Sequence, residues 1–191
     1  MYSKRQRGVT LIELILFIMI VGVALSAILG VMNVTTRSSA DPLRSKQALM
    51  IAEGLLEEVE LAGFTKCDPS GDVDASGNCT IPEAWGQVAP EPAGPRPYDN
   101  VNDYVAQPGT ATAAFNNGAG ALADANGRAL NVNGYTATVA ITPEAVGPAS
   151  APVGATGTAA DTDMLRIRVT VSFDNQSLVL DGYRARYAPG I

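Results

Sequence analysis

The strongest hydrophobic pattern in the sequence lies near the N-terminus, where a long apolar run follows a short basic segment. No charged residue occurs between Glu13 and Arg37, and Leu14–Met32 is almost wholly apolar. As a helix, these 19 residues would be about 28 Å long, which matches the hydrocarbon thickness of a bilayer. The pattern predicts one transmembrane helix within residues 9–36 and a separate domain over residues 37–191.

A second apolar pattern has helical spacing and follows the first. Its small and branched side chains recur every three or four positions and form one face: Ala48, Ile51, Ala52, Leu55, Val59 and Ala62. Asp41 followed by Pro42 is typical of a helix start, and a residue before proline avoids helical dihedral angles. We therefore expect a break or bend near Ala40–Asp41, a fresh helix over residues 42–62, and a stop at Gly63.

The last third of the chain changes to the alternating pattern of β-strands. Apolar and polar residues alternate in Gly134–Thr142 and in Met164–Phe173. The tripeptide DNQ then predicts a tight turn into a third strand, Ser177–Tyr187, antiparallel to the second. In this alternation Arg166 and Arg168 belong to the outer face of the sheet.

Between the helix and the strands lies a long connection, residues 64–133, rich in Pro, Gly, Ala, Asn and Asp. Together the patterns predict an α+β fold. A long N-terminal helix, transmembrane in its first half and amphipathic in its second, packs on a small antiparallel β-sheet over residues 134–187.

Composition and charge exclude several classes of function. The chain has 191 residues, no histidine and a net charge of −6. Removing Lys4, Arg5 and Arg7 at the N-terminus leaves ten basic against 19 acidic residues, a net charge of −9. This acidic remainder argues against nucleic-acid binding. Without histidine, the commonest general base and the usual zinc ligand are missing, and no other catalytic constellation is evident, so we expect no enzyme.

The two cysteines, Cys67 and Cys79, lie 12 positions apart in the long connection. If the domain is exported beyond the membrane, it enters an oxidising compartment, where such a pair forms a disulfide. Free thiols in a reducing cytosol are the alternative.

A calcium loop is a further hypothesis. The stretch DVDASGNCTIPE has oxygen-bearing residues at the spacing of a twelve-residue calcium loop: Asp72, Asp74, Ser76, Asn78 and Glu83. Cysteine and proline within it, and the lack of flanking helices, depart from that pattern. The competing interpretation is a polar turn closed by the disulfide, with solvated acids. The sequence indicates no other cofactor.

The acid at the start of the apolar run raises a physical problem. Basic residues before the run place the N-terminus in the cytoplasm and the domain outside. A carboxylate within lipid costs about 2–3 kcal/mol unless it is paired. A cut between Gly8 and Val9, before the run, leaves the helix attached and creates an amine at Val9. That amine on a neighbouring copy can pair with Glu13. Alternatively, Glu13 lies near the interface and reaches water.

A family resemblance addresses this problem. GVTLIE, from Gly8 to Glu13, after a basic leader and before about twenty apolar residues, resembles the signal of type IV prepilins. The resemblance implies that a membrane-embedded prepilin peptidase removes residues 1–8 and N-methylates Val9. It also implies that Glu13 guides docking on other pilin subunits, and that the fold is pilin-like. The valine at the first mature position departs from major pilins, which favours a minor pilin or a pseudopilin.

Two further stretches resemble one pilin group. ADPLRSKQALMIAEGLLEEV and YDNVNDY are similar to segments of minor pilins of mannose-sensitive haemagglutinin (MSHA) type pili, particularly the D-type minor pilin. The implied protein waits in the bacterial inner membrane with its domain in the periplasm, then enters a surface pilus or a periplasmic pseudopilus. A type II secretion pseudopilin is one alternative. Another is an anchored or tip-located adhesin that binds a sugar or protein through residues 64–133, with Trp85, Tyr98 and Tyr104 as an aromatic platform.

Overall fold

The computed structural model describes residues 8–89, 94–148, 150, 152 and 163–186, and within these it leaves out the side chains of residues 34–41. Its contacts divide the chain into two units, Met1–Arg44 and Ser45–Ile191. We call the second unit the body and the segment Gly8–Asn33 the stem. The leader's basic residues and Tyr187, at the end of the predicted third strand, lie outside the described residues.

Helix α1 runs without a break from Leu11 to Leu61 and contains Pro42 in its interior. The expected break near Ala40–Asp41 is therefore wrong. Residues 42–61 are helical, as predicted, but they continue α1 instead of starting a new helix, and the alternative of a bend stays a prediction. A proline inside a helix removes one backbone hydrogen bond and costs about 3 kcal/mol, but it does not forbid helix on both sides. The apolar stretches before and after Pro42 keep the helical conformation, and they outweigh the preference of the residue before a proline for non-helical dihedral angles.

In the body, one face of α1 is buried and carries the predicted stripe. Ala48, Ala52 and Val59 are fully buried, and Leu55 and Ala62 nearly so. The helix ends at Leu61, close to the expected stop. Gly63 acts there by close approach: its N–H donates to the carbonyl of Asp99 at 2.8 Å, and a Cβ would meet that same oxygen at 2.8 Å. A side chain at this position would separate two backbones that pair.

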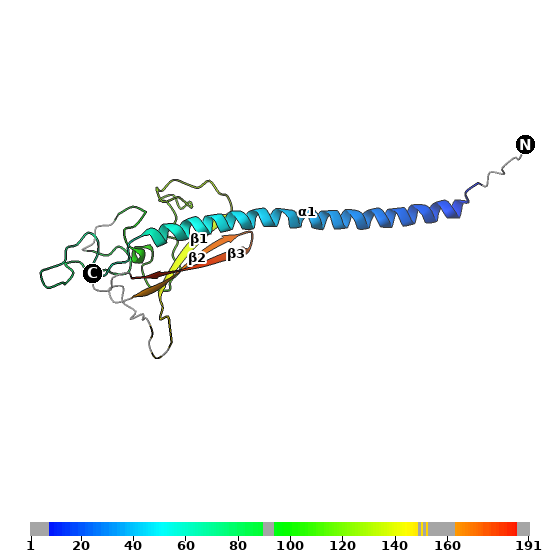
Figure 1. Cartoon of the computed structure of the whole chain (residues 1–191). Helices are drawn as coiled ribbons and strands as arrows, with labels where there is room; N and C mark the ends of the chain where they lie inside the picture. The colour runs from blue at the N-terminus through cyan, green and yellow to red at the C-terminus, as the bar shows by residue number, and fades with distance from the viewer. Residues whose placement is uncertain (1–7, 90–93, 149, 151, 153–162, 187–191) are drawn as a thin grey trace, which may run out of the picture. The chain divides into compact units, whose positions relative to one another are not determined.

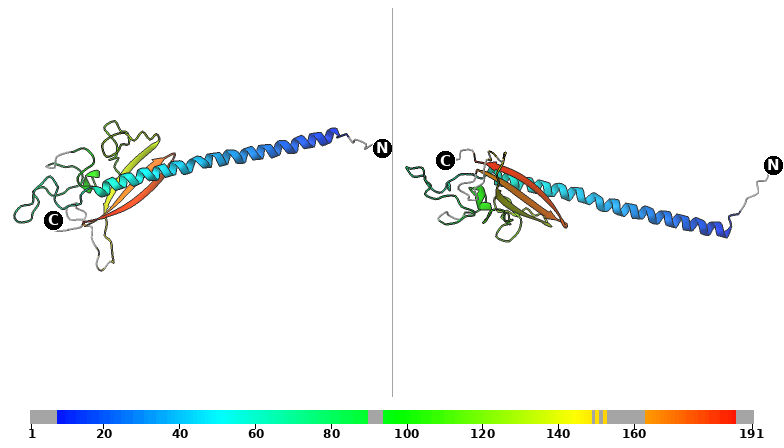
Figure 2. Two further views of the ribbon diagram at one scale, coloured as in Figure 1. Left: turned by 45° about the horizontal axis from the view of Figure 1, so that its top comes forward. Right: turned by 90° about the horizontal axis from the view of Figure 1, so that it is seen from below.

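The sheet has three antiparallel strands in the order β1-β2-β3, formed by Tyr135–Pro143, Met164–Phe173 and Gln176–Ala185. Its strands lie against the C-terminal part of α1, drawn in cyan (Figure 1). The two further views show the same arrangement (Figure 2). The predicted hairpin is confirmed: Phe173 pairs with Gln176, and positive φ angles at Asp174 and Asn175 are typical of a two-residue type I′ turn. Arg166 and Arg168 avoid the buried face, as the alternation predicts.

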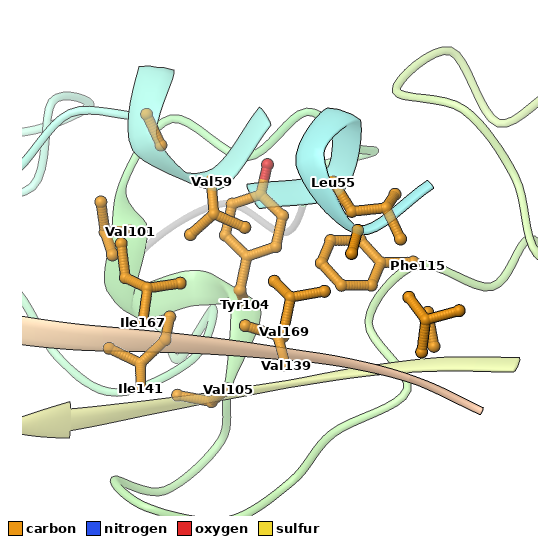
Figure 3. Packing of buried hydrophobic residues seen from close by; sticks show 14 of the residues in the cluster. Leu55, Val59, Val101, Tyr104, Val105, Phe115, Val139, Ile141, Ile167 and Val169 are labelled. Atoms are coloured by element: carbon orange, nitrogen blue, oxygen red, sulfur yellow. The ribbon is translucent and has the colours of Figure 1, made fainter. Parts of the chain in front are cut away.

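The core lies between the buried face of α1 and the inner face of the sheet. Figure 3 shows Leu55 and Val59 from the helix above Val139, Ile141, Ile167 and Val169 from the strands. The long connection also contributes large side chains, which its composition does not suggest: Phe64, Val101, Tyr104, Val105, Phe115 and Leu122 are all buried. A short 3-10 helix, η1 (Val101–Tyr104), carries two of them. The connection is therefore part of the core rather than a surface excursion.

Three five-residue loops of one design order this connection: residues 74–78, 117–121 and 124–128. In each, the side-chain oxygen of the first residue accepts the backbone N–H groups of the third and fifth residues, and a glycine with φ near +80° stands fourth. The backbone N–H of the first residue also donates to the carbonyl of the fifth at 2.9 Å. We call them the Asx loops, because Asp or Asn begins each one.

Candidate functional site

The N-terminal motif stands at the start of α1. Thr10 precedes the helix, its carbonyl accepts the N–H of Leu14 at 3.2 Å, and its hydroxyl accepts the N–H of Glu13 at 3.4 Å. Threonine at the N-cap with an acid three residues later is the capping-box pattern, and an acid in the first turn complements the helix dipole. Sequence reasoning overlooked Thr10, although the pattern TLIE signals it. Glu13 thus has a favourable place in its own helix in addition to the docking role that the resemblance implies.

The fold itself does not explain Gly8. A Cβ built at Gly8 meets no atom within 4 Å, and Val9 beside it is 70% exposed. Neither steric crowding nor a left-handed backbone conformation requires glycine at this position.

The stem has no buried surface of its own. Every residue from Gly8 to Asn33 is exposed, and Leu11–Asn33 forms a helix of 23 residues with a mean hydropathy of 2.9. At 1.5 Å per residue this helix is about 34 Å long, enough to cross a bilayer. Each large aliphatic side chain that stays in water loses the roughly 1.5–3 kcal/mol of free energy that its burial would contribute. The stem therefore needs lipid or other helices around it.

In the body, the most strongly held polar group is an ion pair between α1 and the long connection. Arg96 and Glu58 form a bidentate pair, with atoms 2.6 and 2.8 Å apart and side chains only 6% and 8% exposed. The Tyr104 hydroxyl donates to Glu58 at 3.0 Å, and burial, followed by the charge of Glu58, raises the pKa of that phenol. Tyr104 stays neutral, and its hydroxyl points toward α1 (Figure 3). The pair is structural, because it is closed off from solvent.

The disulfide is present as predicted. Cys67 and Cys79 are bonded, with their Cα atoms 5.2 Å apart, and they enclose the first Asx loop. The bond joins the two antiparallel arms of a hairpin at the start of the connection. Backbone bridges pair the same arms, Cys67 with Pro82 and Val73 with Cys79. This cross-link restricts the unfolded chain over a segment with few large apolar groups.

The residues proposed for calcium do not converge on one point. Asp74 Oδ1 accepts the backbone N–H groups of Ser76 and Asn78, both at 2.8 Å. The side chain of Glu83, which would close the loop, is instead buried and accepts a hydrogen bond from Asn100 at 2.7 Å. Among the residues that the structure describes, no three acids, histidines or cysteines are grouped to hold a metal. Asp72, Asp74 and Glu83 therefore do not form the expected ligand set, and calcium binding stays a prediction without support from the geometry.

The aromatic residues considered for ligand binding serve the core. Tyr104 is 1% exposed, Tyr98 packs edge-on against it with ring centroids 4.8 Å apart, and Trp85 packs against the hydrophobic core. These three side chains pin the connection to the body, which is the simpler of the two interpretations of the sequence.

Comparison with protein families gives one match. Residues 3–29 match the model described as the prokaryotic N-terminal methylation motif. The chain carries a prepilin motif. Neither the characterised proteins nor the solved structures gave a match to the chain.

The matched segment contains Gly8, Val9, Glu13 and most of the stem. The motif is that of type IV pilins and pseudopilins, and it implies a subunit that prepilin peptidase processes and that assembles with other pilins. Together with the apolar helix it implies a prepilin anchored in the inner membrane. The α+β fold, with an apolar N-terminal helix and a three-stranded antiparallel sheet, is pilin-like. Proteins of the pilin family that carry this motif are structural and not enzymes.

Proposed function

We propose that this chain is a minor-pilin-like subunit, made as a prepilin, cleaved between Gly8 and Val9, and assembled into a type IV pilus or a related filament. The proposal depends mainly on the order and spacing of three features at the N-terminus. The methylation motif, an acid five positions after the glycine, and an exposed 23-residue apolar helix occupy one continuous segment.

The exposed stem supports assembly because its apolar side chains need an apolar environment both in the membrane and in a filament. Before assembly, lipid covers it; in a filament, the stems of neighbouring subunits cover it. Val9, once freed as an N-terminal amine and methylated, offers a positive charge that can pair with a neighbour's Glu13. Pairing removes the cost of an isolated carboxylate away from water.

Features of the body fit a periplasmic location before assembly. The Cys67–Cys79 disulfide requires oxidising conditions. The resemblance of the α1 segment after Asp41 and of YDNVNDY to MSHA-type minor pilins favours that filament over others. A type II secretion pseudopilin shares the motif, the stem and the fold, and remains the alternative within the same class. Loss of pili or loss of protein secretion in a strain lacking the chain separates the two.

The test of assembly is Glu13→Ala, with Glu13→Gln beside it. Both variants are expected to insert into the membrane and to be cleaved normally. The amount of the variant chain recovered in sheared filaments is expected to fall at least about tenfold. Without the Glu13 carboxylate, the Val9 amine of the neighbouring subunit is left unpaired, and an unpaired charge in lipid costs about 2–3 kcal/mol. Glu60→Ala, a change in the body, is the matched control. Wild-type recovery of Glu13→Ala would contradict the docking role.

A further inference from the structure

An apolar groove of about 770 Å³ lies in the body and is lined by α1 and by the long connection. The helix contributes Met50, Gly54 and Leu61 among others, and the connection contributes Tyr98 and Leu130. Met50 is 72% exposed and Leu61 78%, an unusual degree for large apolar side chains. All of the lining residues belong to the body, so the groove is formed within one compact unit.

The groove is open at Gly54. A Cβ built there meets no atom within 4 Å, and the residue lies inside α1. Glycine is less favourable than alanine inside a helix, and no described neighbour requires it at this position. Because Gly54 has no side chain, an occupant of the groove can approach the helix backbone closely.

The shape of the groove favours an extended chain as its occupant. Its helix side runs from Gln47 to Leu61, which is about 21 Å at 1.5 Å per residue. Spread over that length, the volume of 770 Å³ gives a cross-section of about 37 Å². A helix with side chains is about 10–12 Å across and needs roughly twice that area. An extended strand, about 4.7 by 10 Å, comes much closer to it, and about six extended residues cover the length.

The charged groups of the groove are acidic on both of its sides. Glu57 belongs to the helix side, and Asp99 and Asp124 belong to the connection side. Glu58 also lines the groove, but Arg96 neutralises it. Among the ion pairs of the described residues, none involves the other three carboxylates. The described lining contains no basic residue, and the groove reaches the C-terminal end of α1, where the helix dipole favours a cation.

The depth of these groups predicts the sequence of the occupant. Leu55 is 4% exposed and lies deep in the groove, whereas Glu57 and Asp99 are exposed at its edge. Successive side chains of an extended segment point to opposite sides. Apolar side chains at alternate positions therefore face the helix at Gly54, and basic side chains between them reach the carboxylates. An acidic or wholly polar segment lacks this complementarity.

We propose that this groove is a docking site for an extended segment of another protein, about six residues long, in which apolar residues alternate with lysine or arginine. The proposal gives the body a binding role in addition to the assembly role of the stem. It assigns Met50 and Gly54 to the apolar contacts, and Glu57, Asp99 and Asp124 to the basic side chains.

Three synthetic peptides test the chemistry of the groove on the full-length chain in nanodiscs of zwitterionic lipid. The first is Leu-Lys-Val-Lys-Leu-Lys, the second has glutamate in place of each lysine, and the third has serine in place of each leucine and valine. All three are blocked at both ends and carry a fluorescent label. Fluorescence anisotropy is expected to show saturable binding of the first peptide, at least about tenfold tighter than of the other two and weaker at high salt.

Gly54→Phe tests the location of binding. The new side chain projects into the open groove and meets no neighbouring atom at its Cβ, so folding, followed by Trp85 fluorescence, should not change. Affinity for the lysine peptide is expected to fall at least about tenfold, because the ring and the peptide clash. The matched controls are Gly54→Ala, which leaves the groove open, and Thr136→Phe, on an exposed position of β1. Both should bind like the wild type.

Neutral substitutions of similar shape test the charge contacts. Glu57→Gln combined with Asp99→Asn is expected to lower the affinity for the lysine peptide about tenfold, which is about threefold for each exposed ion pair. Glu53→Gln combined with Asp72→Asn removes the same charge from exposed positions outside the groove. This control pair is expected to lower the affinity less than about twofold, because salt screens distant charges.

Four results overturn the proposal: no saturable binding of the lysine peptide, equal binding of the glutamate or the serine peptide, wild-type affinity in Gly54→Phe, or equal affinity of the two neutralised pairs. If the peptide fails to bind and Gly54→Phe abolishes self-association of the chain, the occupant is a second copy and the proposal is also overturned. The titration uses purified chain and does not depend on cleavage or filament assembly. Its failure therefore leaves the proposed function intact, and wild-type recovery of Glu13→Ala in filaments leaves this inference intact.

Discussion

The stem and the body treat their apolar side chains in opposite ways. Every residue of the stem is exposed, from Gly8 to Asn33, whereas the body buries valine, isoleucine and leucine from the helix, the sheet and the long connection in one core. The body is therefore stabilised by contacts within the chain, and the stem by contacts that the chain alone does not provide. Substitutions in the body should change folding, and substitutions in the stem should change processing and assembly.

The largest effect on folding is expected at the buried ion pair. Arg96→Ala leaves Glu58 charged and buried, with only the Tyr104 hydroxyl beside it. We expect the free energy of unfolding of the body to fall by about 3–5 kcal/mol. Fluorescence of Trp85, the single tryptophan, reports the body alone in urea titrations of the detergent-solubilised chain. Membrane insertion of the stem should not change.

A second substitution separates lost charge balance from lost packing at this pair. Glu58→Gln added to Arg96→Ala removes the buried charge and should recover part of the stability. Glu57→Ala, an exposed neighbour on α1, should change it by no more than about 0.5 kcal/mol. If Glu57→Ala and Arg96→Ala lower the free energy of unfolding equally, the buried ion pair does not stabilise the body more than an exposed side chain does.

The disulfide comes next. Replacing both Cys67 and Cys79 by serine should lower the free energy of unfolding by about 3 kcal/mol, as expected for a loop of this length. The same urea titration measures it, and reduction of the wild-type chain should reproduce the change. If the doubly substituted chain and the wild type unfold at the same urea concentration, the cross-link does not stabilise the body.

A smaller effect is expected where β3 meets the end of α1. Arg184 donates to the carbonyl of Ala62 at 3.2 Å and supplies the positive charge that the last turn of the helix lacks. Arg184→Ala should cost about 1 kcal/mol. Arg168→Ala, which breaks the exposed pair with Asp181, should cost less. The reverse order would argue against the capping role.

The smallest effect concerns pH. Hydrogen bonds to its carboxylate lower the pKa of Asp74 below its ordinary 3.8. The backbone N–H of Asn78 has the largest effect, followed by the Asn78 side chain and the Ser76 backbone. The folded state therefore binds this proton less tightly than the unfolded state does. Its contribution to stability is present above pH 3.8 and is lost as pH falls through the lower folded value. An NMR titration measures that midpoint, and a midpoint at or above 3.8 would contradict the loop geometry.

A control for the pH effect exists within the chain. Asn117 performs the same task in the second Asx loop with an amide oxygen. Asp74→Asn should therefore keep the loop and abolish its pH dependence.

The parts of this structure that follow from short-range patterns could be predicted from the sequence. Alternation predicted the first two strands, the DNQ turn predicted the third, helical spacing predicted the buried stripe of α1, and two cysteines sufficed for the disulfide. Pro42 misled the prediction because local dihedral preferences say nothing about the apolar stretches on both sides of it.

Other features depend on long-range partners. Glu58 and Arg96 are 38 positions apart, and no local pattern connects them. The calcium hypothesis stays a prediction, because Asp74, Ser76, Gly77 and Asn78 suit both a metal loop and an Asx loop. In the structure, backbone N–H groups point at the Asp74 carboxylate and Glu83 is buried, which is the geometry of an Asx loop. A repeated Asp or Asn with glycine three positions later, as in NGAGALA and DANGRAL, was the available signal.

The most direct test of the central claim is the intact mass and N-terminal sequence of the chain recovered from cells that contain a prepilin peptidase. The expected product begins at Val9, carries one additional methyl group and retains the whole stem. A chain that still begins at Met1, or one that has been cut beyond the stem, would contradict the account.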